Sequence, residues 1–578
     1  MGVVSLGEHD GVRRSDVSNP SAPNAYGAIV RSQLPRLLGL LDRTPASPTY
    51  GCFDRNYWHL KLVTDFPGAT YQQAVLALVW LATQARGDVV GPDRGQVVEW
   101  ARAAMRFWTR IQNRDGSFNE WYAQEHSYCP TAFTTFAISE ALLLLSDQLP
   151  TDDKFTVISA VERAGRWLAR EHNAWVANQN MAALNALLNV WLVTAKEEFC
   201  RAAERKLGSV LEAQNPEGWF PEYDGADPGY SLVATDLLAH YWMKTRDDRV
   251  YEALGRLLEF LSWFIQPDGS VADCGSRATQ HALPYGLELM AHAGQATADR
   301  ILSGLHLAIA NGQGLTPDRV DDRYFAYFYI NSYVGAFHAC SGGHGQWKGA
   351  KKGSIVYPNA GLGVFSRGSR TAVISLKRNN MLRVFVDQTL VYADAGYQVG
   401  LARGRQGMSC GFDPKQTWST ASGQDGSVVV RTSGRFFGSS PTMWLVIPLK
   451  IWAHLMLSSG TVATWFNTWL KSREVAFPRR LPVILERDVR IEETAITVTD
   501  RVILQARIRV TGLSPIEQGC VTHSPSAGFY TGAPVQRLID HLKVSALTES
   551  LVSRGKVTVI KTLSLDEKKE TTLQVEWR

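Results

Sequence analysis

The sequence of 578 residues has few cysteines and few of the short motifs that mark metal or nucleotide sites. Its seven cysteines are scattered and form no Cys-x-x-Cys pair, so their spacing indicates neither a disulfide framework nor a thiolate zinc site. The sequence contains no His-Glu-x-x-His pair, no calcium-type carboxylate loop and no glycine motif ending in Gly-Lys-Ser or Gly-Lys-Thr. We therefore expect no metal and no cofactor.

Charge of one sign is also scarce, and so are long apolar runs. Sixty Lys and Arg residues against 55 Asp and Glu give a net charge of +5, which is too small to indicate nucleic acid as a partner. The long apolar stretch at 443–470 is interrupted by Pro, Lys, His and Gly, so we expect no membrane span. The N-terminus lacks the apolar segment of a secretory signal, so we expect a cytoplasmic protein.

Helical periodicity, by contrast, runs from about residue 28 to 340, and two kinds of helix alternate along it. Helices of the first kind are nearly apolar on every side, and we place them at 70–85, 131–145, 180–194, 231–242 and 281–292. Helices of the second kind are amphipathic, and we place them at 95–111, 155–171, 198–213, 248–264 and 298–310. Because an all-apolar helix is buried on every side, the pattern predicts an inner and an outer layer.

Glycines punctuate this pattern at repeating intervals. Gly68, Gly116, Gly218 and Gly269 each precede an inner helix, about 50 or 100 residues apart. One helical hairpin per unit, repeated five or six times, predicts an α/α toroid with a central cleft, and an open solenoid is the alternative.

The character of the chain changes after about residue 345. Runs with period-two alternation, separated by Gly and Ser, predict the strands of an antiparallel β-sandwich. The fold class is therefore α+β with two domains, a toroid at 1–345 and a sandwich at 346–578 that carries a helical insertion near 445–472. A basic loop at 346–354, which includes Lys348, joins the two domains and either lines a cleft between them or is a solvated linker.

Polar and aromatic side chains gather in the segments before the inner helices, which all lie at one end of a toroid. Such a convergence is typical of a carbohydrate cleft. Helix capping is the competing interpretation for Asn178, Asn180, Asp227 and Ser276. The candidate substrate-binding residues are Arg55, Glu120, Trp121, Trp219, Tyr223, Arg277, His281 and Lys348.

These features resemble those of the heparinase II/III-like polysaccharide lyases. The resemblance rests on the hairpins punctuated by Asp-Gly, the segments NQN and GADPGYS that open two inner helices, and TAVISLKRNNMLRVF in the β half. It implies β-elimination on a uronic-acid-containing, glycosaminoglycan-like polysaccharide by an Asn, a Tyr and a His. The matching residues are Asn178 or Asn180 and Tyr230, with His126 and His338 as candidates for the His; Gln179 stands where the family often has a His.

The chemistry explains these residue types. β-Elimination removes the C5 proton of a uronate and expels the C4 oxygen, so the adjacent carboxylate has to be neutralised first. An amide such as Asn178 or Asn180, helped by Arg277, can hydrogen-bond the carboxylate and stabilise the enolate that develops. A Tyr or His then abstracts the proton, and a cation near Tyr230 would lower its pKa from about 10.

Three other functions stay open at this point. A uronate C5-epimerase begins with the same proton abstraction but returns the proton to the opposite face. A glycoside hydrolase would use two carboxylates among Glu120, Glu222, Asp224 and Asp227. A non-catalytic glycan-binding protein would keep the cleft and lack a reactive group, as Gln179 suggests.

Overall fold

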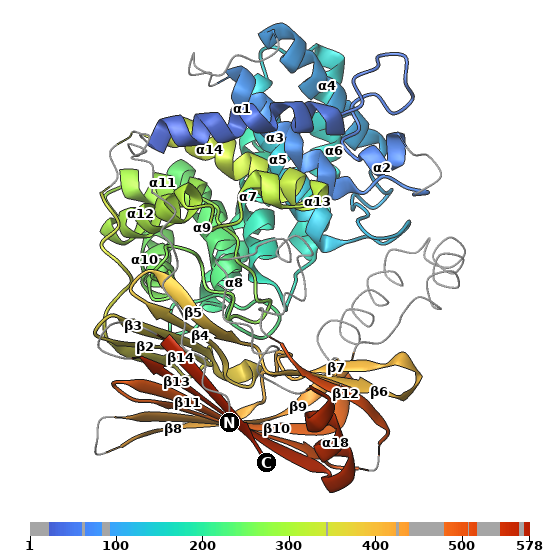
Figure 1. Ribbon diagram of the computed structural model, residues 1–578. Coiled ribbons are helices and arrows are strands. Elements are labelled where there is room, and N and C mark those ends of the chain that lie inside the picture. The colour runs from blue at the N-terminus through green and yellow to red at the C-terminus, as the bar shows by residue number, and fades with distance from the viewer. Residues whose placement is uncertain are drawn as a thin grey trace.

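A computed structural model describes most of the chain. The described residues are 22–59, 64–83, 93–340, 342, 345–423, 427–438, 479–506, 508–516, 544–565 and 571–578. Within them, a helical N-terminal region is followed by a C-terminal region of antiparallel sheets, so the fold is α+β (Figure 1). The helical insertion predicted near 445–472 lies outside the described residues. The domain boundary at 345 falls between the end of the helical region at Ala339 and the first strand, which begins at Ser354, and it stays a prediction.

The inner helices contact one another in a closed order. Each packs on the next along the chain, and the last packs on the first. They are α3 (Val75–Thr83), preceded by η1 (Ala69–Ala74), α5 (Tyr128–Leu145), α7 (Ala177–Thr194), α9 (Pro228–Thr245), α11 (Tyr285–His292) and α14 (Ile330–Ala339). In the described part of the chain α5 alone is long and apolar enough to cross a membrane, and 89% of it is buried inside the protein.

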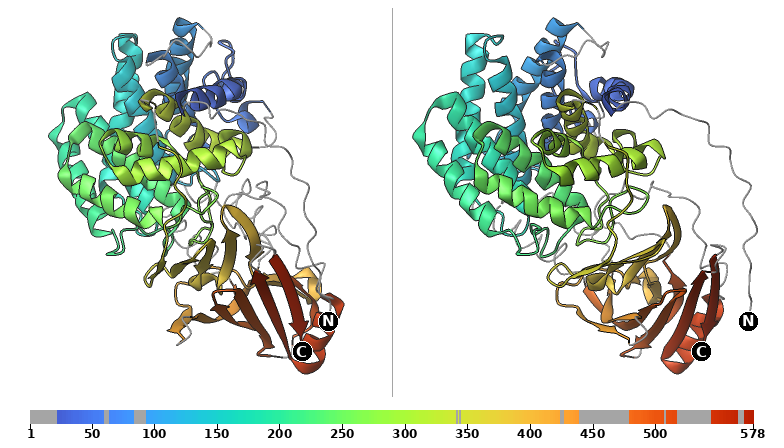
Figure 2. Two further views of the ribbon diagram at one scale, coloured as in Figure 1. Left: turned by 60° about the vertical axis from the view of Figure 1, so that its left-hand side comes forward. Right: turned by 90° about the vertical axis from the view of Figure 1, so that its left-hand side faces the viewer.

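The outer helices form a second layer around the inner ones. From α4 to α12 each contacts the next, and α1 packs on α14. They are α1 (Ala22–Leu40), α4 (Arg94–Arg110), α6 (Thr151–Arg170), α8 (Glu197–Glu212), α10 (Asp248–Ser262) and α12 (Ala296–Ala310). Shorter helical turns are α2 (Arg55–Trp58), η2 (Pro317–Arg319), α13 (Asp322–Tyr324) and η3 (Phe325–Tyr329). The predicted inner and outer layers are both present (Figure 2).

A glycine turn recurs where an outer helix leads toward the next inner helix. Gly116, Gly218 and Gly269 all have φ between +84° and +99°, and each lies against the backbone of an outer helix, so that an added Cβ would come within 2.4 Å of a carbonyl oxygen. Gly51 has the same conformation and the same kind of contact. Gly68, which the sequence suggested as the first of the series, is not in the left-handed region, so Gly51 is its true equivalent.

Replacing Gly116 by Ala is expected to destabilise the helical region. The new Cβ would lie 2.4 Å from the carbonyl oxygen of Arg163 at a left-handed φ, so we expect a loss of about 2 kcal/mol or more. Gly208 is the control, because it lies within α8 and a Cβ added there would meet no neighbouring atom within 4 Å, so Gly208→Ala should gain about 0.5–1 kcal/mol. Chemical denaturation of both variants tests this, and equal effects would contradict it.

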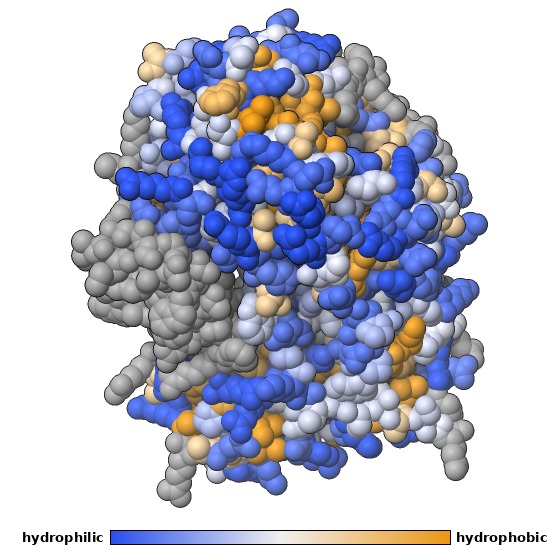
Figure 3. Space-filling view, turned by 180° about the vertical axis from the view of Figure 1, so that it is seen from behind, coloured by the Kyte–Doolittle hydropathy of each residue, from blue (hydrophilic) through white to orange (hydrophobic). Residues whose placement is uncertain are grey.

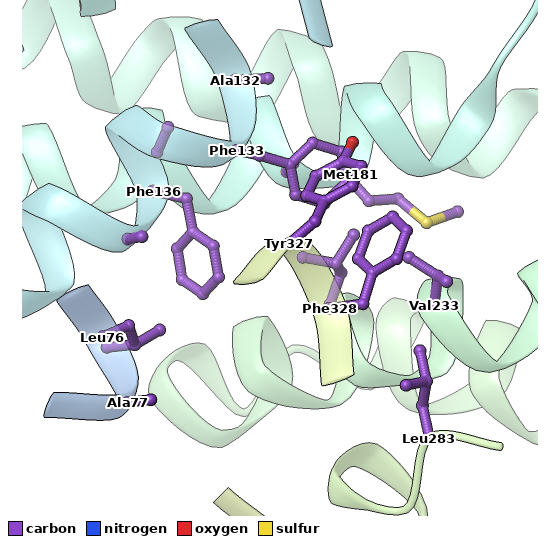
Figure 4. Close-up of a cluster of buried hydrophobic side chains, with 14 of the residues drawn as sticks. Leu76, Ala77, Ala132, Phe133, Phe136, Met181, Val233, Leu283, Tyr327 and Phe328 are labelled. Carbon is purple, nitrogen blue, oxygen red and sulfur yellow. The ribbon is translucent and has the colours of Figure 1, made fainter. Parts of the chain in front are cut away.

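The last inner helix closes the ring and changes its winding on the way. From Asp322 the chain forms α13, passes through a π-helical turn at η3 and continues as α14. The π turn directs Tyr327 and Phe328 into the middle of the ring, where their rings stack with centroids 3.7 Å apart. Figure 4 shows both among side chains of the surrounding helices, including Phe133 and Phe136 of α5. The ring axis is therefore filled with aromatic side chains at this level.

Two antiparallel sheets make up the C-terminal region. The first has the strand order β1-β2-β3-β4-β5, and in the second β8 pairs with β9 beside the order β12-β6-β7-β9-β10-β11-β13-β14. The strands of the first sheet are β1 (Ser354–Tyr357), β2 (Leu362–Arg367), β3 (Arg370–Ser375), β4 (Met381–Val386) and β5 (Thr389–Asp394). The strands of the second are β6 (Tyr397–Leu401), β7 (Gln406–Met408), β8 (Thr417–Ser422), β9 (Val428–Gly438), β10 (Arg479–Ile491), β11 (Ala495–Leu504), β12 (Val510–Pro515), β13 (Lys556–Leu565) and β14 (Thr571–Trp577).

Apolar side chains of the two sheets meet in a shared core, in which Val384 of β4 and Val489 of β10 are fully buried. Helix α18 (Val544–Arg554) packs through Leu547 and Leu551 on the same face of the second sheet, further along the strands, because Leu485 beside α18 and Val489 in the shared core are four residues apart on β10. The exposed surface of the molecule is mostly hydrophilic on the face seen in Figure 3, with apolar patches on both the helical and the β part.

The β region holds a loop of the helical region in place. Arg378, which is 1% exposed, donates hydrogen bonds of 2.7 Å to the carbonyl oxygens of Gly275 and Ser276. Ser375 donates to the carbonyl of Cys274, and Arg383 forms an ion pair with Asp273. These side chains come from the sequence TAVISLKRNNMLRVF, so the strand motif of the β region positions the helical-region loop at 273–281.

Candidate active site

A recess opens at the N-terminal ends of α5, α7 and α9. It has about 480 Å³ of space, its open mouth included. Its walls are formed by Glu120, Trp121, Cys129, Val176, Asn178, Gln179, Tyr223, Tyr230, Arg323, Tyr324, Tyr327 and Phe328. Five residues predicted from the sequence are therefore brought together, namely Glu120, Trp121, Asn178, Tyr223 and Tyr230.

Asn178 lies in the first turn of α7 and is held from behind by Glu222. The Nδ2 group of Asn178 donates to Glu222 Oε1 at 2.7 Å, and the backbone N–H of Asn178 donates to the same oxygen at 3.2 Å. Burial raises the pKa of Glu222 to about 8, and the hydrogen bonds from Asn178 oppose that shift. The carboxamide of Asn178 is thus fixed with one N–H directed at Glu222.

Asn180 points to the opposite side of α7. It accepts a hydrogen bond of 2.9 Å from the hydroxyl of Tyr128 and donates to the carbonyl of Asn173 at 2.6 Å. Lys206 donates to the same Tyr128 hydroxyl at 3.1 Å. Because these bonds join α5, α7 and α8 outside the recess, we correct the sequence interpretation and retain Asn178 alone as the candidate amide.

Tyr230 and Tyr324 form a hydrogen-bonded pair in the recess. Tyr230 comes from the first turn of α9, where Asp227 caps the helix by accepting from the backbone N–H of Tyr230 at 3.0 Å. Burial raises the pKa of both phenols, and the neighbouring charge of Arg277 works against this shift in each. Arg323 and the hydrogen bond from Tyr230 lower the pKa of Tyr324 further. Tyr324 is therefore the phenol whose ionised form is better stabilised.

Arg323 adds a cation and an aromatic contact at the rim. Its guanidinium lies 4.2 Å from the ring centroid of Trp121 and forms an ion pair with Glu120. Trp121 is 56% exposed, which is exceptional for a large apolar side chain in the described part of this chain. An exposed indole at the rim of a recess offers a flat surface on which a planar or ring-shaped ligand can stack.

Two further predicted residues lie just behind the wall. The guanidinium of Arg277 stacks on the ring of Tyr223 at 4.3 Å from its centroid. The imidazole of His281 packs edge-on against Tyr230, with centroids 5.0 Å apart, and its Nδ1 lies 2.9 Å from the hydroxyl of Tyr329. Burial lowers the pKa of His281 to about 3, so this imidazole is neutral at physiological pH.

Backbone strain is concentrated in the loops that carry these residues. Tyr223, Asp224 and Ala278 have φ between +51° and +64°, as do Gln124 and His126 in the loop before α5. A left-handed residue other than glycine costs on the order of 1 kcal/mol or more. Such strain is common where a loop has to present side chains to a ligand, and two of these loops supply Trp121 and Tyr223 to the recess wall, while the third lies behind it.

The structure does not bring the remaining predicted residues into the recess. His126 Nδ1 lies 2.7 Å from Asp115 Oδ2, and this contact helps to hold the pKa of Asp115 at about 2 against burial. His338 follows Tyr327 by 11 residues, which is roughly 16 Å along a helix. Trp219 packs in a core shared with the β region, and Arg55 is exposed at the start of α2.

The basic loop at 346–354 also lies elsewhere. Its Lys351 forms an ion pair with Glu259 of α10, and Trp347 donates to the carbonyl of Pro267 at 3.1 Å. Lys348 is exposed on this loop and is not part of the recess wall. The loop therefore runs along the outer helices, which corrects the expectation that it lines the cleft.

Arg323 and Tyr324 were not predicted. They belong to the segment DDRYFAYFYI, which lacks an Asp-Gly turn and was not assigned to an inner helix. A signal was present, however, because closing a ring requires one more inner helix after 281–292, and this segment is the next apolar run. In the described residues we find no group of three His, Cys, Asp or Glu side chains that could hold a metal ion.

Comparison with known proteins gives a fold and no family. The sequence matches no family model, and no curated protein matches it. Among solved structures, the chondroitin AC lyase of Streptomyces coelicolor A3, in complex with chondroitin sulphate, is similar with a TM-score of 0.52 at 10% identity over 87% of this chain and 69% of that one. A Paenibacillus xanthan lyase is similar with a TM-score of 0.51 at 9% identity, over 87% of this chain and 47% of its own.

Heparinase III is less similar, with a TM-score of 0.42 at 9% identity over 82% of this chain and 80% of that one. The chain spans about two thirds of the length of the chondroitin AC lyase and about half of the xanthan lyase. At these identities the similarity to the chondroitin AC lyase and the xanthan lyase concerns the fold alone.

Proposed function

We propose that the protein is a polysaccharide lyase that cleaves a uronic-acid-containing polysaccharide or oligosaccharide by β-elimination. The observation that carries the proposal is the recess in which the Asn178 amide, the hydrogen-bonded pair Tyr230 and Tyr324, and the cation Arg323 converge. In this proposal the closed double layer of helices is an α/α toroid and the two sheets are a β-sandwich. The finer relationship to heparinase II/III-like lyases rests on the sequence motifs.

The amide and the cations make the C5 proton more acidic. Asn178 has one amide N–H engaged with Glu222, and its second N–H is available to the uronate carboxylate. Arg277, behind Tyr223, and Arg323, at the rim, supply positive charge near the enolate that forms when the proton leaves. Donors already fixed in place need little reorganisation as this charge develops.

The tyrosine pair can perform both proton transfers. Tyr324 acts in its phenolate form, which is the minor form at neutral pH because burial raises its pKa. The phenolate removes the C5 proton, and the electron pair forms the C4=C5 double bond as the C4–O4 bond breaks. The departing O4 takes its proton from Tyr230. The proton on Tyr324 then crosses the existing hydrogen bond to Tyr230 and restores the pair. His281, with its pKa lowered by burial, serves as packing for Tyr230 in this scheme.

The positions of the candidate carboxylates disfavour the glycoside hydrolase alternative. Glu120 is paired with Arg323, Glu222 lies behind Asn178, and Asp227 caps α9. In the described part of the chain, Glu120 is the one carboxylate on the recess wall, whereas hydrolysis of a glycoside commonly needs two.

Incubation with a panel of uronate polymers in heavy water tests the proposal. We expect products with unsaturated ends that absorb in the ultraviolet. Deuterium at C5 with unchanged chain length would instead indicate an epimerase, and new reducing ends without unsaturation would indicate a hydrolase. The double variant Tyr230→Phe, Tyr324→Phe serves as the inactive control, and a panel on which the native protein forms no product would contradict the proposal.

A further inference from the structure

Glu222 is a buried acid placed directly beneath the predicted carboxylate-binding amide. It is 2% exposed, and both of its hydrogen bonds from Asn178 end on Oε1. Its Oε2 is buried and has no hydrogen-bond partner in the described part of the chain. An ionised carboxylate ordinarily gathers several donors, so an unpartnered oxygen in a buried place is the arrangement expected of a neutral carboxylic acid.

The charged groups around Glu222 do not compensate a negative charge there. Asp227, from the N-cap of α9, is itself acidic and raises the pKa of Glu222, whereas Arg277, from the loop at 273–281, lowers it. Arg277 is directed at the ring of Tyr223 and makes no ion pair with Glu222 in the described structure. Among the described residues of α7, Asn178 is the one that hydrogen-bonds the Glu222 side chain, and it is uncharged. Arg378 of the β region donates to three backbone carbonyl oxygens and makes no ion pair with Glu222 in the described structure.

We propose that Glu222 is a positioning residue that holds Asn178 as a neutral acid, so that binding of a uronate carboxylate requires Glu222 to stay protonated. This inference rests on the proposed function for the identity of the ligand. The amide nitrogen of Asn178 has two hydrogens, and a single amide group then links Glu222 to the uronate. If Glu222 ionised, two carboxylates would share one amide in a poorly solvated place and would repel each other.

The sign of the pH dependence follows from this linkage. Burial raises the pKa of Glu222 to about 8, so the binding-competent acid predominates below that pH and is lost above it. With one proton coupled to binding, affinity is expected to fall about tenfold for each pH unit above the pKa. Lys206, whose pKa burial lowers to about 8, titrates in the same range behind Asn180, so the experiment has to separate the two groups.

Calorimetric measurement of binding affinity across this pH range distinguishes Glu222 from Lys206. The ligand is the uronate oligosaccharide of the panel that binds most tightly. The affinity of the native protein should fall about tenfold for each pH unit above the pKa of Glu222. The variant Glu222→Gln should bind with similar affinity at neutral pH, and its affinity should not depend on pH in this range. Lys206→Met should keep the pH dependence of the native protein. An oligosaccharide whose carboxyl groups have been reduced to alcohols should bind without the steep loss. A native profile that is flat, or one that is unchanged in Glu222→Gln, would overturn the inference while leaving the lyase proposal standing.

The protonation state of Glu222 can also be measured directly, without a ligand. Infrared difference spectra between the native protein and Glu222→Gln should contain a carboxylic-acid C=O band at neutral pH, which disappears as the pH rises through the pKa of Glu222. A carboxylate band at neutral pH would overturn the inference even if every polymer in the panel were cleaved. Conversely, the acid band together with no binding to any uronate would contradict the function and, with it, the assigned ligand.

Discussion

Replacing Tyr324 by Phe is expected to lower turnover of the uronate polymer by about 100-fold or more, the usual scale for losing a general base. The substitution removes the hydroxyl that accepts from Tyr230 and that Arg323 and Arg277 stabilise as the phenolate, and it keeps the ring that fills the recess. Tyr230→Phe should have an effect of similar size, because it removes the proton for the departing oxygen. Substrate affinity and melting temperature should change little in both variants.

The matched control is Tyr327→Phe. Tyr327 lies in the π turn that directly follows Tyr324 and on the same recess wall, but its hydroxyl lies 2.8 Å from the Sγ of Cys129 and is not part of the tyrosine pair. Its loss should alter turnover by no more than a few-fold, with a stability change of about 1 kcal/mol. Full activity in Tyr324→Phe together with a large loss in Tyr230→Phe would return the role of base to Tyr230, and full activity in both would remove the pair from the mechanism.

Replacing Arg487 by Met is expected to cause the largest loss of stability. Arg487 is fully buried between the sheets, with its Nε 2.6 Å from Asp500 Oδ1 and an Nη 2.9 Å from Asp394. Lys561 binds both acids from β13, so two positive and two negative charges form a neutral cluster. Removing one partner leaves an uncompensated charge in a fully buried place, which costs about 3–5 kcal/mol.

The control lies three residues further along the same strand. Arg490 pairs with Glu492 at the surface, where both side chains are more than a third exposed, so Arg490→Met should cost less than about 1 kcal/mol. Thermal unfolding followed by the near-ultraviolet signal should separate the two variants by roughly 10 °C if the β region unfolds as a unit. Equal melting temperatures would show that the buried cluster contributes no more than a surface pair.

Much of the helical region could be predicted because burial imposes a pattern on the sequence. The inner helices were predicted to start at 131, 180 and 231, and α5, α7 and α9 begin three residues earlier. The first turns of these helices, which the sequence pattern did not include, contain polar residues of the kind found in loops, such as Asn178 and Tyr230. In the folded protein these residues occupy first helical turns, where Glu222 and Asp227 accept from their free backbone N–H groups.

What could not be predicted depends on contacts between distant segments. Tyr324 reaches the recess because α14 closes the ring against α3, and no local pattern near residue 324 contains that information. Asn178 and Asn180 are equivalent by composition, and two residues of helix rotation direct them to opposite environments. In the β region the short strands β7 and β8 have no clear alternation and are formed by pairing with their neighbours.

If the protein is the proposed lyase, the aromatic filling of the ring axis also limits how a polymer can move through it. Tyr327 and Phe328 stack across the centre, and Phe328 separates the recess from a second, mainly apolar space of about 430 Å³ deeper in the ring. A polysaccharide therefore cannot be threaded along the axis as through a tunnel. It has to lie across the end of the ring and leave by the side on which it arrived, so we expect each cut to be followed by release and fresh encounter. Product lengths early in a digestion should accordingly be broadly distributed.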